Sequence, residues 1–220
     1  MNRTISMLIA AAAALFAGPA GAQGADVGLV NMLSGDVSYQ SPGASSSKAQ
    51  AFMKVRQGDK FNVSNGAQVR VVYFQGGRQE TWSGPASFTA GMQSSQAQSG
   101  QPSQVATLPS TVPQKIAQVP DLIQIARLGR SGGVAVRGAG KAPRLTAEQQ
   151  SEVAQAKDTY KKMRAGTSVD DITPELYLYS VLQDYLLYID MKPVVEEMSK
   201  RQPGNPEVQE LAAWVKSKTQ

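Results

Sequence analysis

The stretch that decides the N-terminal fold is VYFQGGRQETW, residues 72–82. It reads as two extended runs joined by Gln75, Gly76 and Gly77. The run over residues 69–74 is rich in β-branched and aromatic side chains, which favour strands. The two glycines tolerate the positive φ angles that tight hairpin turns require. The sequence therefore predicts a β-hairpin whose second strand runs from Arg78 to Trp82.

Further strand signals lie on both sides of this hairpin. Short apolar or alternating runs occur at residues 27–33, 36–39, 52–55, 60–63 and 86–89, and turn residues separate them. Six or seven short strands, spaced by about ten residues, are typical of a compact sandwich or barrel. We therefore expect a small all-β sandwich over residues 23–91.

The segment that follows the predicted sandwich is polar and uncharged. Residues 93–114 contain no charged residue and consist mostly of Gln, Ser, Pro, Ala and Thr. Such a composition offers little apolar surface to offset the entropy of ordering, so we expect a flexible linker over residues 92–119. Residues 120–143 are then expected to hold a short helix, with Asp121 as its N-cap and Gly129 after its end, and a glycine-rich connector with a strand over 132–138.

The C-terminal part, residues 144–220, has the punctuation of a helical module. A capping box over residues 146–149 opens a helix expected to reach about Ala165. A second helix is expected over 173–189, a third over 190–201, and a fourth from Asn205. The apolar stripe of the second helix comprises Leu178, Val181, Leu182, Tyr185, Leu186 and Ile189. The sequence thus predicts an α+β fold: a small all-β sandwich, a flexible linker and an α-helical hairpin module.

The first residues indicate export. Arg3 precedes an apolar run over residues 5–16, and small residues at Ala20 and Ala22 suit a signal-peptide cleavage site. We expect a signal peptide over 1–22, cleaved between Ala22 and Gln23. A retained membrane anchor needs about 20 apolar residues, whereas Gly18 and Pro19 interrupt this run. These features predict a periplasmic protein without stable membrane insertion.

Composition argues against several classes of function. The chain of 220 residues contains no histidine and no cysteine, which removes Ser-His-Asp triads, cysteine nucleophiles and the usual zinc sites. We therefore expect no cofactor and no metal. The net charge of +5 lies mostly between the predicted domains, because residues 144–220 carry ten basic and twelve acidic residues. Without a strongly basic domain, nucleic acid is not an expected partner.

Paired carboxylates leave one enzymatic alternative open. A glycoside hydrolase works with two Asp or Glu residues that flank the scissile bond. The candidates here are Asp170, Asp171, Glu175, Glu196 and Glu197, all of which are predicted to lie at helix starts or on solvated faces. The alternative hypothesis is therefore a carbohydrate-active or peptidoglycan-modifying enzyme.

Four side chains are candidates for binding a partner. Arg78 and Trp82 belong to the strand that leaves the hairpin turn, and Tyr177 and Tyr188 are tyrosines that the predicted apolar stripe leaves free. Aromatic and arginine side chains are enriched at the centres of protein interfaces. The expected partner is an envelope protein or a glycan.

The N-terminal pattern resembles the FecR-type periplasmic domain over residues 27–91. The resemblance is carried by Gly35-Asp36-Val37, Val55, Gly58-Asp59, Gly66, residues 69–74, Gly76-Gly77 and Gly84 to Phe88. It implies that the glycines occupy turns, that Val37, Val71 and Phe74 are core residues, and that there is no catalytic residue. FecR-type regulators place a sigma-factor-binding segment and a transmembrane helix before this domain. A signal peptide stands there in this chain, so transmembrane signalling is not expected.

The helical part resembles a degenerate tetratricopeptide hairpin. If Pro203 takes the closing proline of the repeat, then Leu178, Leu182 and Val195 fall on its apolar positions, whereas Tyr179 and Met191 replace small residues. The leading hypothesis is a non-enzymatic periplasmic binding or scaffold protein with a FecR-like β domain and a helical interaction module. A ligand sensor that has lost its membrane anchor is a third possibility.

Overall fold

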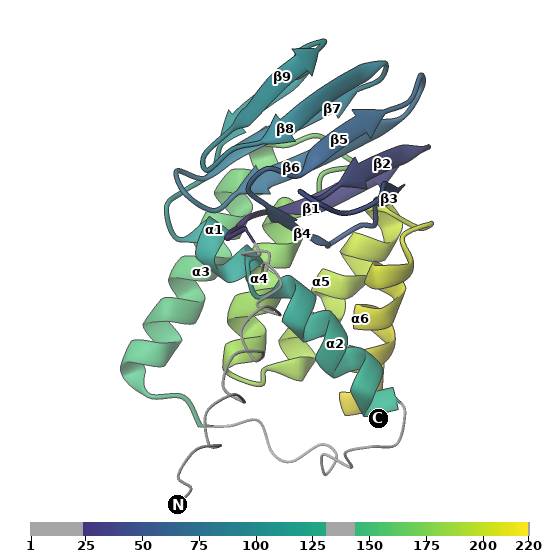
Figure 1. The fold of residues 1–220 in the computed structure, drawn as a ribbon. Helices are drawn as coiled ribbons and strands as arrows, with labels where there is room; N and C mark the ends of the chain where they lie inside the picture. The colour runs from purple at the N-terminus through teal and green to yellow at the C-terminus, as the bar shows by residue number, and fades with distance from the viewer. Residues whose placement is uncertain (1–23, 131–143, 220) are drawn as a thin grey trace, which may run out of the picture.

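The computed structural model describes residues 24–130 and 144–219. The expected signal peptide, its cleavage site at Ala22 and Gln23, and the strand expected over 132–138 lie outside these residues. The fold is α+β, with two antiparallel five-stranded sheets followed by several helices. Figure 1 shows the helices packed on one side of the sandwich, next to β1 and β4.

The two sheets divide the strands as follows. The sheet next to the helices, called the helix-side sheet, has the order β10 (Gln104–Thr107), β7 (Arg78–Ser83), β6 (Gln68–Tyr73), β1 (Asp26–Ser34) and β4 (Lys54–Arg56). The outer sheet has the order β3 (Ser47–Lys48), β2 (Val37–Gln40), β5 (Lys60–Val63), β8 (Ala86–Ala90) and β9 (Ser95–Ser99). All pairings are antiparallel.

The predicted hairpin is confirmed as β6 and β7. Gly76 and Gly77 have φ angles of 83° and 64°, so both turn positions need the freedom of glycine. The side chains of β6 alternate between two cores. Val69 and Val71 face the interior of the sandwich, whereas Val72 belongs to the core shared with the helices. This alternation makes the helix-side sheet a wall with two buried faces.

The sandwich interior is built around stacked aromatic rings. Trp82 stacks on Phe88 with ring centroids 4.5 Å apart, and Phe88 stacks on Phe61 at 5.0 Å. Val37 and Val71 lie in this interior, as the sequence resemblance implied. Phe74 packs instead against the core on the helix side.

The prediction of a flexible linker over residues 92–119 is wrong, because this segment contains regular secondary structure. Within residues 92–119 the chain forms β9, β10 and the short helix α1 (Val112–Ile116). The two strands pair with β8 and β7 at the sheet edges, where backbone hydrogen bonds hold a strand that buries few side chains of its own. Leu108, Val112 and Ile116 are buried in the core shared with the helices.

The remaining helices are α2 (Val119–Arg130), α3 (Ala147–Gly166), α4 (Thr173–Asp184), α5 (Tyr188–Arg201) and α6 (Pro206–Lys218). Each helix from α3 to α6 packs against the next, and α2 packs against α6. The capping box is confirmed, since Thr146 Oγ1 accepts a hydrogen bond from the Gln149 amide at 3.3 Å. Asn205 caps α6 by accepting from the Glu207 amide at 3.0 Å. Within residues 24–130 and 144–219, no helix combines the length and hydrophobicity needed to cross a membrane.

Two helix boundaries differ from the prediction. The second predicted helix ends at Asp184, and Leu186 follows with a φ of 54°, a left-handed conformation that a helix does not continue through. Leu186 and Ile189 are consequently exposed instead of completing the apolar stripe. Gly129 lies inside α2, where an added Cβ would approach the Trp214 ring to 2.1 Å. Its role is close packing between α2 and α6, not helix termination.

Candidate functional site

The boundary between the helix-side sheet and the helices, called the seam, has a closed part and an open part. In the closed part, Leu29, Phe52 and Val72 from the sandwich share one apolar core with residues of the helices. This shared core joins the sandwich and the helices into one packed body. It fixes the geometry of every group at the seam.

A buried polar cluster completes the closed part. This polar junction consists of Asn31, Arg70 and Gln79 from the helix-side sheet and Asp170, Asp171 and Thr173 at the start of α4. Arg70 is its centre, with a side chain only 3% exposed. Its Nη2 lies 3.3 Å from Asp170 Oδ2, and its Nη1 lies 3.7 Å from Asp171 Oδ1. A guanidinium from the sheet thus lies between two carboxylates that precede α4 and offsets part of their charge.

Hydrogen bonds from uncharged donors also connect these residues. Gln79 Nε2 donates to Asp171 Oδ2 at 2.7 Å, and the Thr173 amide donates to Asp171 Oδ1 at 2.8 Å. Asn31 Nδ2 donates to Thr173 Oγ1 at 2.5 Å. Because each carboxylate oxygen of Asp171 has a donor, its charge is compensated within the protein interior.

Asp170 lies at the edge of this cluster, where its side chain is half exposed. Burial acts to raise the pKa of Asp170, but the hydrogen bond from Ser168 and the charge of Arg70 outweigh it and hold that pKa below its usual value. Asp170 therefore stays ionised at neutral pH. An ionised, paired carboxylate is poorly suited to act as a general acid.

Two other candidate carboxylates, Asp171 and Glu175, are buried and lie next to arginines. Glu175 is buried, which contradicts its expected solvated position, and burial raises its pKa. The charges of Arg164 and Arg201, at 3.0 Å and 3.5 Å, oppose that rise. Asp171 is likewise buried instead of solvated.

Glu196 is exposed on α5, as expected, and Glu197 pairs with Arg201 at 2.5 Å.

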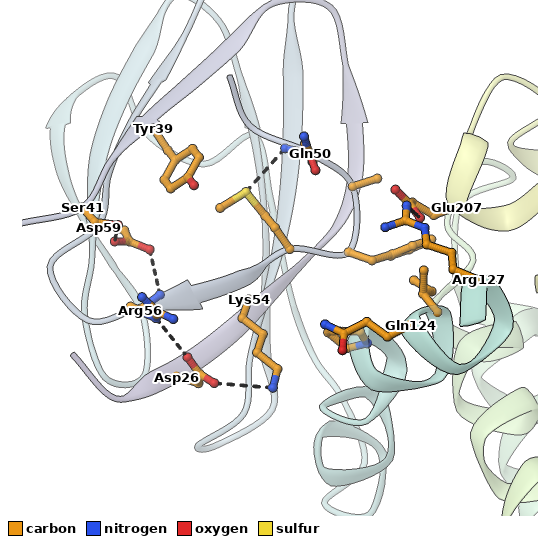
Figure 2. A pocket seen from close by; sticks show the side chains of 15 residues that line it. Asp26, Tyr39, Ser41, Gln50, Lys54, Arg56, Asp59, Gln124, Arg127 and Glu207 are labelled. Atoms are coloured by element: carbon orange, nitrogen blue, oxygen red, sulfur yellow. Dashed lines mark hydrogen bonds and ion pairs between the residues drawn. The ribbon is translucent and has the colours of Figure 1, made fainter. Parts of the chain in front are cut away.

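The open part of the seam begins with a hollow of about 490 Å³, the first hollow. Figure 2 shows Asp26, Lys54 and Arg56 from the sandwich on one side and Gln124 and Arg127 from α2 on the other. Lys54 Nζ lies 3.7 Å from Asp26 and Arg56 Nε lies 3.4 Å from it. The sandwich wall of this hollow is therefore polar, with its charges paired.

The loop that forms the floor of the first hollow has a strained backbone. Phe52 has a φ of 59°, a conformation uncommon for a bulky residue. Its amide donates to the Val30 carbonyl at 2.6 Å, and its ring is buried in the core shared with the helices. Strained residues persist only where the surrounding structure fixes them, and they cluster at binding sites.

A larger hollow of about 1,020 Å³, the second hollow, adjoins the first. Its walls are the end of β1, residues 48–51, and the turn between α5 and α6 over residues 201–207. The two hollows share Gln50, Ala51, Arg127 and Glu207. Arg127 Nη2 donates to Glu207 Oε2 at 2.5 Å at their border. We call the two hollows together the seam cleft.

The predicted partner residues on the hairpin lie elsewhere. Trp82 is 1% exposed, because it fills the sandwich interior, and its Nε1 donates to Glu80 Oε2 at 3.1 Å. Arg78 Nε donates to Glu80 Oε1 at 2.5 Å and is partly exposed. The buried Glu80 thus brings Arg78 and Trp82 together, but Trp82 has no surface to offer to a partner.

The predicted tyrosines do not form a surface patch either. Tyr177 is 5% exposed inside α4, and Tyr188 is half-buried at the start of α5. Neither lines the seam cleft. Sequence analysis did not predict the cleft residues, because they come from β1, β4, α2 and the α5–α6 turn, which are far apart in the sequence. The positive φ at Phe52 has no signal in the sequence.

Comparisons with known proteins add no further assignment. A scan against protein-family models, a search of curated proteins and a search of solved structures find no match to this chain. Among the described residues, no group of three or more His, Cys, Asp or Glu side chains is arranged to hold a metal ion. The functional argument therefore rests on the geometry of the seam.

Proposed function

We propose that this chain is a non-enzymatic binding or scaffold protein of the periplasm, and that it holds its partner in the seam cleft. The observation that carries the proposal is an open cleft whose carboxylates all have partners within the protein. Asp26, Asp170 and Glu207 line it and lie within ion-pair distance of an arginine, and Asp59 accepts hydrogen bonds from Ser41 Oγ at 2.6 Å and from the Arg56 amide at 2.8 Å. Such a cleft offers hydrogen bonds and charge recognition without a free acid and base for catalysis.

The domain resemblances remain part of this proposal. A FecR-like origin of the sandwich is supported by glycines with positive φ at Gly35, Gly58, Gly66, Gly76 and Gly77, the turns of the resemblance. A tetratricopeptide-like origin of the helices is supported by the successive packing of α4, α5 and α6. In both cases the support concerns architecture.

The enzymatic alternative requires two carboxylates that face a bound sugar about 5–9.5 Å apart. Asp171, in the polar junction, and Glu175, paired with Arg164 and Arg201, do not line the seam cleft. The carboxylates that line it are Asp26, Asp59, Asp170 and Glu207, so a carbohydrate-active enzyme would have to release two of these from their present partners. This makes binding the better-supported proposal.

Cross-linking from position 204 tests the proposal directly. It lies in the wall of the second hollow, and an added Cβ there meets no atom within 4 Å. Gly166 is a matched control, because its added Cβ also meets open space and it lies outside the seam cleft. A photoreactive benzoylphenylalanine is placed at either position, and the protein is irradiated in the cell-envelope fraction of the source organism.

The proposal predicts one stoichiometric adduct from position 204 and none from position 166. Adduct formation should fall when unmodified wild-type protein is added in excess. Equal labelling from both positions, or no adduct from position 204, would contradict the proposed site. Hydrolysis of purified peptidoglycan that is abolished by Asp170→Asn would favour the enzyme.

A further inference from the structure

We infer that the second hollow receives an extended peptide segment of a partner protein, which adds as a strand to the free edge of β1. This inference rests on the proposed function and names the class of its ligand. The second hollow is the part of the seam cleft that contains strand backbone. Residues Met32, Leu33 and Ser34, the last of β1, line it.

The end of β1 has a neighbouring strand on one side only. Its pairing with β6 continues to Ser34, which lies opposite Gln68. On the other side, its pairing with β4 reaches only Leu29, opposite Lys54. Val30 makes the last backbone hydrogen bonds on that side: its carbonyl accepts from the Phe52 amide at 2.6 Å, and its amide donates to the Met53 carbonyl at 3.0 Å.

Beyond Val30, no backbone hydrogen bond from another part of residues 24–130 and 144–219 meets β1 on the β4 side. Residues 32–34 therefore lack a neighbouring strand on this side, and Leu33 and Ser34, which are partly or fully exposed, form the accessible end of that edge, whereas Met32 is buried. Such an edge is a template for an added strand, whose main-chain hydrogen bonds supply affinity. The added strand would continue the helix-side sheet from the place that β4 leaves empty.

The opposite wall of the second hollow suits the side chains of such a strand. Successive side chains of a strand point to opposite faces. Around the edge of β1, the hollow offers apolar surface at Leu33, Ala51 and Pro206, and amide side chains at Gln50, Gln68, Gln202 and Asn205. Alternating apolar and polar side chains on the peptide would match these two kinds of surface.

Charge adds one further requirement. Arg127, Asp170, Arg201 and Glu207 all have ion-pair partners. Lys48 is exposed at the rim, and within the described residues its side chain makes no hydrogen bond or ion pair, while its backbone pairs with Ser38 in the outer sheet. A peptide with an acidic residue near Lys48 would complete the charge pairing of the hollow.

The experiment uses random heptapeptides displayed on phage. Peptides are selected on the wild-type protein without its signal peptide and counter-selected on Gly204→Trp, which places an indole ring in the wall of the hollow. The inference predicts enriched peptides with alternating β-branched residues and an acidic residue. Failure to enrich any peptide that depends on Gly204 would overturn it.

The most enriched peptide then tests the role of Lys48 by fluorescence anisotropy. Lys48→Glu should weaken binding about threefold or more, as expected for an exposed ion pair replaced by a repulsive one. A peptide with Lys in place of its acidic residue should regain affinity for this variant. Lys162→Glu, the same charge change on an exposed face of α3, should leave binding unchanged. Equal effects of both variants would contradict recognition by Lys48.

Methylation of the peptide amides tests strand addition itself. An added strand turns alternate amides toward β1, so methylating that set should weaken binding about fivefold for each lost hydrogen bond. Methylating the other set should have little effect. Equal sensitivity of both sets would overturn strand addition.

The two proposals fail in different ways. If no peptide binds but position 204 still forms a specific adduct, the seam cleft remains the binding site and the peptide inference is wrong. A glycan as the adduct would lead to the same conclusion. If no selected peptide depends on Gly204 and cross-linking at position 204 yields no adduct, the proposed function is wrong as well.

Discussion

The polar junction and the seam cleft lie at the same boundary between the helix-side sheet and the helices, but the junction is closely packed and the cleft is open. In the polar junction, Arg70 from the sheet meets Asp170 and Asp171 from the start of α4; Arg70 and Asp171 are buried, and Asp170 is half exposed at the edge. In the cleft, the walls stand apart and leave hollows of about 490 and 1,020 Å³. The difference shows that the junction joins the sheet to the helices through buried contacts, whereas the cleft is the part of the boundary where we propose that a partner binds. Binding sites are most precise when rigid elements support them in this way.

The strongest way to break this comparison is to remove the centre of the junction. Arg70→Met leaves the buried Asp171 without its guanidinium, so unfolding free energy should fall by about 3–5 kcal/mol. Urea unfolding measures the change. Arg56→Met is the matched control, because its pair with Asp26 is 40% and 39% exposed and should contribute less than about 1 kcal/mol. A similar, small loss for both variants would mean that the junction does not hold the seam.

Substitutions in the β6–β7 turn test whether the helix-side sheet is also rigid at this turn. Replacing Gly76 and Gly77 by Val should cost about 1–2 kcal/mol at each position, because both need positive φ. Gly77→Val should cost more than Gly76→Val, since its Cβ would lie 3.0 Å from the Leu108 carbonyl while Gly76 faces open space. Thermal unfolding of the single and double variants gives the order. Equal melting temperatures for wild type and double variant would instead indicate a relaxed loop and direct attention to Arg78.

A smaller effect is expected for the pH dependence of stability, through Asp170, which lies between the polar junction and the seam cleft. The pKa of Asp170 is lower in the folded protein than in the unfolded chain, so its ionised form stabilises the fold. That stabilisation is complete above the ordinary carboxyl pKa of about 4 and is lost as pH falls through the lower folded value. Asp170→Asn should therefore reduce the urea midpoint at neutral pH and converge with wild type in acid. Asp158→Asn, on an exposed face of α3, serves as the charge-matched control. A pH-independent difference would show that the charge of Asp170 is not involved.

Local features of the fold could be predicted from the sequence, because their signals lie within a few residues. The turn at Gly76 and Gly77 and the cap at Thr146 depend on backbone angles and on one nearby side chain. The polar junction could not be predicted, since Asn31 and Thr173 are 142 positions apart and each alone has the character of a surface residue. The same reason explains why Asp171 and Glu175 were expected in solvent.

The expected linker shows a different limit. A polar Gln/Ser composition indicates that a segment cannot form its own core, but it does not exclude pairing at the edge of an existing sheet. Gln104 pairs opposite Thr81 through its backbone, and the sandwich supplies the core. The cleft could not be predicted for a related reason, because the unpaired end of β1 depends on where β4 ends.

The most direct test of the open seam compares Gly204→Trp with Gly166→Trp in two measurements on the same samples: the thermal unfolding midpoint, and recovery of the partner identified by cross-linking at position 204. Because an added Cβ meets open space at both glycines, both variants should keep the wild-type midpoint. Gly204→Trp alone should lose the partner. Retention of the partner by a folded Gly204→Trp protein would contradict the assignment of the seam cleft as the binding site.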